Sequence, residues 1–223
     1  METSPIHPLR RKISLVRPRL QAASYRVWTH PRLRDFYPQL LITFHWMIRA
    51  SVPLMEAARA RSLELRDPVA IRFAYYLDTH IPEEQNHDEW LLADLDVLGI
   101  PRTAALNTTP SPTMASLVGS QYYWIFHTHP VALLGYIAVL EGNPAPIEFL
   151  NEVVQRTELP RSAFGSMFKH AALDLQHRND LDDLLWEFPF EPEHDALTGV
   201  SAITTVNLFA RVFEEIAASQ DAV

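Results

Sequence analysis

The stretch from residue 164 to residue 185 constrains the fold most, because its pattern predicts one long helix with an unusual seam. Residues three or four positions apart share a helix face, and this face is apolar at both ends. Between the apolar ends the seam carries His170, Asp174 and His177. Buried charged groups are costly without partners, so these side chains predict either a hydrogen-bonded network or a metal site. Two imidazoles and a carboxylate suit a divalent transition metal.

The composition favours helices and a single domain with a substantial core. The chain has 223 residues, of which 48% are hydrophobic and 21% are charged. It contains only 6 glycines and few β-branched runs, so a sheet is not expected, and its 17 prolines stand where helices begin or break. We therefore expect an all-α fold, with an extended N-terminal arm over residues 1–34 and one metal-binding domain over residues 35–223.

Several classes of protein are disfavoured by the sequence. A net charge of −8 argues against general nucleic-acid binding. The absence of cysteine excludes disulfides, thiolate metal sites and iron–sulfur clusters, and fits a cytoplasmic protein. The longest uninterrupted apolar run, residues 131–140, is too short to cross a membrane. The basic N-terminus has no apolar signal core, so no membrane partner is expected.

Prolines and glycines divide the chain into its expected helices. Pro53 is expected to kink the first helix, and Asp67 with Pro68 forms a good helix start. Pro82 is expected to break the second helix or restart it, and Gly99 is expected to close the third. The expected helices span residues 38–65, 67–79, 83–98, 114–127, 130–141, 146–156, 161–185 and 191–218, the last as one helix or two.

The other half of a metal site is predicted on three further helices. Glu84 and His87 stand three residues apart at positions of an apolar seam, and Glu141 ends the most hydrophobic helix. Glu56 lies one position away from the centre of the first helix's apolar stripe. Two helices thus each supply one glutamate, and two others each supply a carboxylate-x-x-His pair. This is the ligand arrangement of carboxylate-bridged di-iron bundles.

Alternatives exist for several of these residues. Glu56 could form an ion pair with Arg59 one turn later, and Glu141 could be an exposed helix end. His80 precedes Glu84 by four residues, but the expected break between them favours a structural role for His80. Glu83 is expected to be solvated, although a rotated kink could exchange it with Glu84.

The spacing His170-x-x-x-Asp174-x-x-His177, about thirty residues after Glu141, resembles the heme-oxygenase-like di-iron oxidases and oxygenases. The segment HPVALLGYIAVLEG before Glu141 also looks like theirs, and the resemblance spans roughly residues 38–218. It implies a bundle of about seven helices, two Fe(II) ions per chain, dioxygen as co-substrate, and a homodimer as the oligomer. The implied metal ligands are Glu56, Glu84, His87, Glu141, His170, Asp174 and His177.

The resemblance implies oxidation of a small amine- or carboxylate-bearing molecule, by N-oxygenation or C–C cleavage, in a biosynthetic role. No catalytic residue beyond the metal ligands is expected, and the choice between iron and manganese stays open. One alternative is a ferritin-like or other metal-binding scaffold without turnover. Another is a metal-independent enzyme on the same bundle, although the thiaminase-type relatives need a cysteine that this chain lacks.

Overall fold

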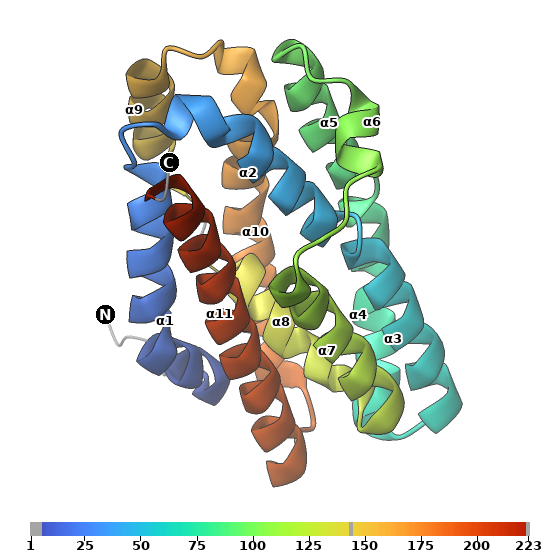
Figure 1. Ribbon diagram of the computed structural model, residues 1–223. Helices are drawn as coiled ribbons and strands as arrows, with labels where there is room; N and C mark the ends of the chain where they lie inside the picture. Colours follow the sequence, from blue (N-terminus) through green and yellow to red (C-terminus); the bar gives the residue numbers. More distant parts are fainter. Residues whose placement is uncertain (1–5, 143–144, 222–223) are drawn as a thin grey trace.

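The computed structural model describes residues 6–142 and 145–221, and the side chains of residues 174–177 and 179 lie outside that description. Within the described residues the chain forms only helices (Figure 1), which confirms the expected all-α fold. It has eleven α-helices in the described residues, where about seven were expected. The number is higher because expected helices are divided by breaks and because the N-terminal segment is helical.

The first half of the described chain forms six helices. They are α1 (Pro8–Trp28), α2 (Leu33–Ile48), α3 (Ser51–Leu65), α4 (Pro68–Glu84), α5 (His87–Val97) and the short α6 (Arg102–Leu106). The second half has α7 (Pro112–His127), η1 (Pro130–Ala132), α8 (Leu133–Leu140), α9 (Ile147–Thr157), η2 (Arg161–Phe164), α10 (Gly165–Glu187) and α11 (Pro192–Asp221).

Helix α11 crosses the front of the bundle between α1 and α7 (Figure 1) and packs against α1, α7 and α8. The inner face of its first half consists largely of small residues, namely Thr198, Gly199, Ser201, Ala202 and Thr205. Such residues allow a close approach of α8. At the crossing, a Cβ on Gly135 would lie 2.7 Å from the backbone nitrogen of Ala202. The two helices therefore meet almost backbone to backbone.

Helix α11 is also long and apolar enough to cross a membrane, by length and composition alone. Half of its most apolar stretch is buried inside the bundle. A core helix of a soluble protein has the same properties, so this helix is weak evidence for a membrane span. No uninterrupted apolar run marks α11 in the sequence, because threonine, serine and asparagine residues lie within its apolar stretch.

The prediction of an extended N-terminal arm is wrong, because residues 8–28 form helix α1. Pro8 occupies the first turn, where its missing N–H is not needed, and the ring of His7 accepts a hydrogen bond from the Leu9 amide. Helix α1 lies alongside α11 in the same direction (Figure 1). Its buried face carries Leu9, Ile13, Ala23, Val27 and Trp28. The arginines between these positions hide the apolar periodicity in the sequence.

The first expected helix, residues 38–65, is divided into α2 and α3. The break lies at Arg49 and Ala50 rather than at Pro53. Pro53 occupies the first turn of α3, where the backbone N–H groups have no partner within the helix. The proline therefore fits the helix start instead of kinking a continuous helix.

The position of the break after α4 also differs from the prediction, and it determines the site. Pro82 lies inside the last turn of α4, which continues to Glu84. The chain turns only at Gln85 and Asn86, where Asn86 adopts a left-handed conformation with φ 66°. His80 and Glu84 consequently share one helix face, one turn apart.

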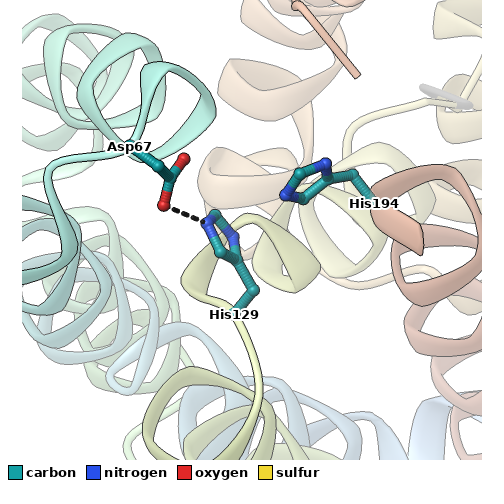
Figure 2. A group of neighbouring side chains, drawn as sticks. All are labelled: Asp67, His129 and His194. Atoms are coloured by element: carbon teal, nitrogen blue, oxygen red, sulfur yellow. Dashed lines mark hydrogen bonds and ion pairs between the residues drawn. The ribbon is translucent and has the colours of Figure 1, made fainter. Parts of the chain in front are cut away.

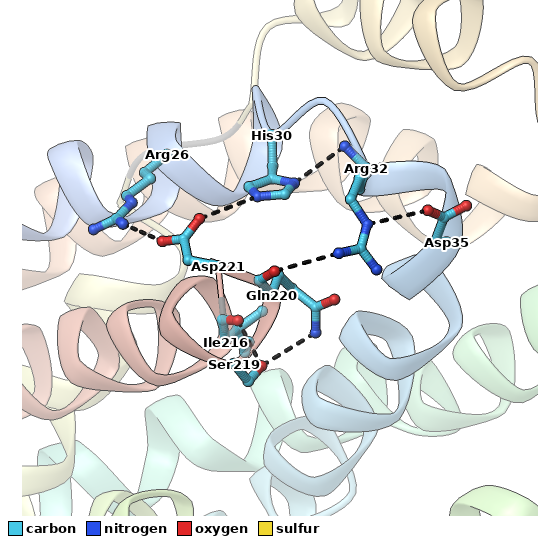
Figure 3. A network of polar contacts seen from close by, with 8 residues as sticks. All are labelled: Arg26, His30, Arg32, Asp35, Ile216, Ser219, Gln220 and Asp221. Atoms are coloured by element: carbon cyan, nitrogen blue, oxygen red, sulfur yellow. Dashed lines mark hydrogen bonds and ion pairs between the residues drawn. The ribbon is translucent and has the colours of Figure 1, made fainter. Parts of the chain in front are cut away.

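The C-terminal end of α11 is attached to the connection between α1 and α2 by a polar network (Figure 3). Asp221 pairs with Arg26 and lies 3.5 Å from Nε2 of His30. Arg32 donates from Nη1 to the carbonyl oxygen of Gln220 at 3.4 Å. Exposed ion pairs add little stability, so this network mainly fixes where α11 ends relative to α1.

His45 on α2 is a buried polar residue in the apolar core. Its side chain is 1% exposed, and neither ring nitrogen has a hydrogen-bond partner among the described residues. Burial lowers the pKa of His45, and nearby Arg49 acts in the same direction. The unfolded chain then binds this proton more readily than the folded chain, so stability decreases as the pH falls through about 6.5.

We expect His45→Leu to raise the free energy of unfolding by about 1 kcal/mol at pH 7, because it removes an unsatisfied buried group. The increase in the free energy of unfolding should be larger at pH 5.5 than at pH 7. Urea denaturation at both pH values measures it. His127→Leu, at an exposed position on α7, should change stability little. A destabilised His45→Leu protein would contradict this account of His45.

Candidate metal centre

Three side chains from α4 and α8 converge inside the bundle. His80 and Glu84 lie one turn apart on α4, and Glu141 caps the C-terminus of α8. Their potential ligand atoms all lie within 4.8 Å of one another. The distance from Nε2 of His80 to Oε1 of Glu141 is 3.0 Å. This spacing would place all three donors around a single ion.

The electrostatics of His80 depend on its two carboxylate neighbours. Burial alone would lower the pKa of His80, but the hydrogen bond and charge of Glu141, together with Glu84, raise it to about 9. The second ring nitrogen, Nδ1, lies 3.4 Å from Oε2 of Glu83. A carboxylate on Nδ1 holds a metal-binding imidazole in the tautomer that presents Nε2 to the ion. Tyr76 stacks on the ring and holds its plane.

Glu84 connects this group to the next helix. Its Oε2 lies 3.1 Å from Nδ1 of His87, which opens α5 after the turn at Asn86. Burial opposes ionisation of Glu84, but the hydrogen bond with His87 and the charges of His87, His80 and His170 keep the pKa of Glu84 below its usual value. Glu84 is therefore an anionic donor between histidines.

His170 on α10 completes the described part of the site. Its ring meets that of His87 edge to face, with the centroids 5.0 Å apart, and also contacts Trp90. Nδ1 of His170 lies 2.9 Å from the carbonyl oxygen of Ser166, so Nδ1 carries the proton and donates it. The lone pair of the ring is then on Nε2, as a metal ligand requires.

The start of α10 is fixed by a buried carboxylate from α5. Asp94 accepts a hydrogen bond from the backbone amide of Ser166 at 2.9 Å. Burial raises the pKa of Asp94, although its hydrogen bonds with Ser166 oppose the shift. Since Ser166 is also the partner of His170, Asp94 sets the position of the His170 ring.

Two of the predicted ligands cannot be placed, because the side chains of Asp174 and His177 lie outside the described residues. The backbone around them is helical as part of α10. Leu181 and Leu184, which continue the same seam, are buried as the pattern indicates.

The structure does not bring Glu56 to the group. Helix α3 turns Leu54, Met55 and Ala58 into the core, so Glu56 points to the exposed side. The alternative pairing with Arg59 is not observed either, because Arg59 pairs with Asp78 on α4. The sequence already places Glu56 one position off the apolar stripe, and in α3 this position lies on the exposed side.

A small internal void lies beside Glu84 and Glu141. It has a volume of about 20 Å³, enough for one water-sized occupant. Ser51, Leu140 and Tyr136 are among the residues that line it. Burial raises the pKa of Tyr136 above its usual range, with the charge of Glu141 acting in the same direction. The phenol therefore stays neutral next to the carboxylates.

A second group of possible metal ligands consists of Asp67, His129 and His194 (Figure 2). Nδ1 of His129 accepts a hydrogen bond from the Val131 amide at 3.1 Å, and Nδ1 of His194 accepts one from the Glu191 amide at 3.2 Å. Both neutral rings must then carry their proton on Nε2.

The Nε2–H group of His129 accordingly donates to Oδ2 of Asp67 at 3.1 Å. A metal ion would need the Nε2 lone pair that this tautomer lacks. We therefore interpret the second group as a hydrogen-bonded connection between helix starts.

His80 is the one member of the central group that the sequence analysis placed outside the ligands. The signal was present, because His80-x-x-x-Glu84-x-x-His87 repeats the spacing of the seam on α10. The expected break at Pro82 led to its rejection. The side chain of Glu83 is 46% exposed against 10% for Glu84, so Glu83 is solvated as expected and the alternative exchange of the two glutamates does not occur.

Comparisons with known proteins establish the fold but not the activity. No family model matches the chain, and no significant match is found among curated proteins. A protein from Shewanella denitrificans, described as a domain of unknown function with a heme oxygenase-like fold, superposes with a TM-score of 0.80 at 15% identity, covering 96% of this chain and 92% of that one.

Two other solved structures are similar over most of their length. A CADD-like protein of unknown function from Nostoc punctiforme has a TM-score of 0.67 at 18% identity, with 95% of this chain and 97% of that chain covered. A TenA homologue from Pseudomonas syringae has a TM-score of 0.63 at 12% identity, with 90% of each chain covered. The chain therefore has a heme oxygenase-like helical fold.

Proposed function

We propose that this protein is a non-heme di-iron enzyme that activates dioxygen to oxidise a small amine- or carboxylate-bearing molecule. The observation that carries the proposal is the convergence of His80, Glu84 and Glu141 in the interior, with the imidazoles of His87 and His170 beside Glu84. Three histidines and two glutamates are the donor types that iron bundles use. The proposal thus replaces the predicted Glu56 with His80.

The described residues fit a metal centre on the chemistry of their donors. His170 presents Nε2 because Nδ1 donates to Ser166, and His80 has a carboxylate on Nδ1 to fix its orientation. Glu84 and Glu141 border a void large enough for one small occupant. Asp174 and His177, one and two turns beyond His170 on α10, would supply further ligands for a second ion.

Bound iron would supply the electrons and the open coordination positions that dioxygen activation needs. The protein supplies geometry and a dry environment. Tyr76 and Trp90 pack against the histidine rings, and the void is enclosed by apolar residues of α3 and α8. The Glu141 carboxylate and the His80 imidazole can share a proton through their 3.0 Å contact when no metal holds them.

A metal-binding scaffold without turnover remains the second candidate, because the same donors would bind iron in a storage protein. It predicts iron uptake without fast oxygen chemistry. A metal-independent enzyme on this bundle predicts neither iron uptake nor fast oxygen chemistry. It also does not explain the orientation of the His170 ring.

The test is anaerobic loading with Fe(II), followed by rapid mixing with oxygenated buffer under observation in the visible region. We expect a transient absorption band in the wild-type protein that is lost in His170→Ala. His194→Ala, which alters the hydrogen-bonded second group, should retain the band. Iron uptake with no optical change would favour the scaffold, and no iron uptake would contradict both metal-based functions.

A further inference from the structure

Arg10 on α1 connects three helices at the end of α8. Its side chain is 15% exposed. Its Nε donates to Oδ1 of Asp182 on α10 at 2.6 Å, and its Nη1 donates to the carbonyl oxygen of Ala138 on α8 at 2.8 Å. Glu141 follows Ala138 by three residues, and α10 carries His170. The guanidinium thus contacts both helices through which the second half of the chain supplies donors to the candidate metal centre.

The contact with Ala138 caps the last turn of α8. The last four carbonyl groups of a helix lack partners within the helix, and a cation at this end interacts favourably with the helix dipole. Helix α8 has only eight residues, so it depends on contacts at its ends more than a long helix does. Arg10 supplies a hydrogen bond and a positive charge in the turn that leads to Glu141.

Gly142 shows how closely the guanidinium approaches this turn. A Cβ at Gly142 would collide with Nη1 of Arg10 and with the carbonyl oxygen of Ala138. Arg10 therefore lies against the backbone both before and after Glu141. A planar guanidinium held by two hydrogen bonds has a fixed orientation, and it can fix the backbone that it contacts.

Side-chain packing does not by itself hold this end of α8 against α1. A cavity of about 600 Å³ lies between α1, α8, α10 and α11, and its lining residues include Ala138, Leu140 and Gly142. The last turn of α8 therefore borders a cavity on the side that faces α1. The guanidinium of Arg10 connects the helices beside this cavity.

The burial of Arg10 is costly for a residue that would only fill space. Its Nη2 is buried and has no hydrogen-bond partner among the described residues. An unpaired buried donor costs free energy, and apolar groups of similar volume often replace a buried ion pair without loss of stability. An apolar side chain could thus fill this position, but it could not fix the end of α8 relative to α10.

We infer that Arg10 is a positioning residue, which fixes the end of α8 and thereby holds Glu141 within 3.0 Å of His80. This role belongs to the metal-free protein. Its further meaning, that Arg10 also sets the affinity for iron, rests on the proposed function. Helix α1 would then be a necessary support of the centre.

The test is amide hydrogen exchange of the metal-free protein, followed by NMR. In Arg10→Met we expect the amides of Val139, Leu140 and Glu141 to exchange at least about 10-fold faster, because the end of α8 opens locally when its cap is lost. The urea midpoint should change little, since the unpaired Nη2 is lost together with the two hydrogen bonds. A purely structural arginine would instead lower the midpoint and accelerate exchange throughout the bundle.

Iron affinity is measured separately by anaerobic Fe(II) titration against a coloured chelator. Arg10→Met should weaken it by about 10-fold, the effect of losing a residue that supports a ligand. Arg10→Lys, which keeps a donor for the Ala138 carbonyl, should restore most of the protection and affinity. Arg19→Met alters an exposed arginine of α1 paired with Glu214, so this matched control should change nothing.

A second variant covers the case in which Arg10→Met does not fold. The side chain of Asp182 is 37% exposed, so Asp182→Ala should fold while it frees the guanidinium from α10. It should also accelerate exchange at the end of α8. Unchanged exchange there in the folded variants, or equal acceleration throughout the bundle, would overturn the inference. Faster exchange at the end of α8 in a protein that binds no iron would support the role of Arg10 and contradict the di-iron proposal.

Discussion

Gly135→Ala should reduce the free energy of unfolding by about 3 kcal/mol or more, a large effect for one methyl group. The added Cβ would collide with the carbonyl oxygen of Thr198 and lie 2.7 Å from the backbone nitrogen of Ala202. Neither atom can rotate away, because both belong to the backbone of α11. The helices must separate, and the separation would loosen the packing of α8 against α11.

The measurement is urea denaturation followed by circular dichroism, with Gly119→Ala as the matched control. Gly119 lies inside α7 on an exposed face, and a Cβ there would meet nothing within 4 Å. Alanine should stabilise that position by about 0.5 to 1 kcal/mol, because glycine is the more flexible residue in the unfolded chain. Similar stabilities for the two variants would contradict the described crossing of α8 and α11.

Glu84→Gln should lower the affinity for Fe(II) by more than about 100-fold. The substitution keeps the size of the side chain but removes the negative charge that contacts His87 at 3.1 Å and borders the void. Changing a residue that only supports a metal ligand already lowers affinity by about 10- to 100-fold, so losing a ligand should have a larger effect. Anaerobic titration against a coloured iron chelator would measure the affinity.

Two other glutamate variants provide a comparison for the iron affinity of Glu84→Gln. Glu83→Gln removes the carboxylate 3.4 Å from Nδ1 of His80 and should lower affinity by about 10-fold. Glu89→Gln, on the surface of α5 and paired with Arg102, should leave it unchanged. An unchanged affinity in Glu84→Gln, or equal losses in all three variants, would show that iron binds elsewhere.

Much of the fold was predictable because local signals agreed with the final packing. Asp67 accepts the Ala70 amide and Pro68 opens α4 as expected, and Ser111 with Pro112 opens α7 in the same way. The apolar seams of α5 and α10 are buried at Leu91 and Leu181. Caps and seams are local properties, so a single sequence can reveal them.

The errors arose where tertiary contacts outweigh local preference. Pro82 would normally end a helix, but α4 continues for two more residues, and this extension keeps Glu84 on the same helix face as His80. Helix α1 has arginines interspersed among its apolar residues, and it packs against α11, almost two hundred residues away. The cavity beside Arg10 was missed for the same reason, since residues 1–34 were expected to be extended.

The candidate site was partly predictable from polar residues at apolar seam positions. That signal identified Glu84, His87, Glu141 and His170, which the structure places close together. The same signal could not exclude Glu56, because a shift of one position along a helix moves a side chain from the core to the surface. It also could not find the hydrogen bond from His170 to Ser166, which depends on the ring's orientation.

The most direct measurement is X-ray diffraction at the iron absorption edge from crystals prepared with Fe(II) without oxygen. The account predicts two anomalous peaks per chain inside the bundle, one at His80, Glu84 and Glu141 and the other next to His170. No peak at these positions, or a peak only at Asp67, His129 and His194, would contradict it.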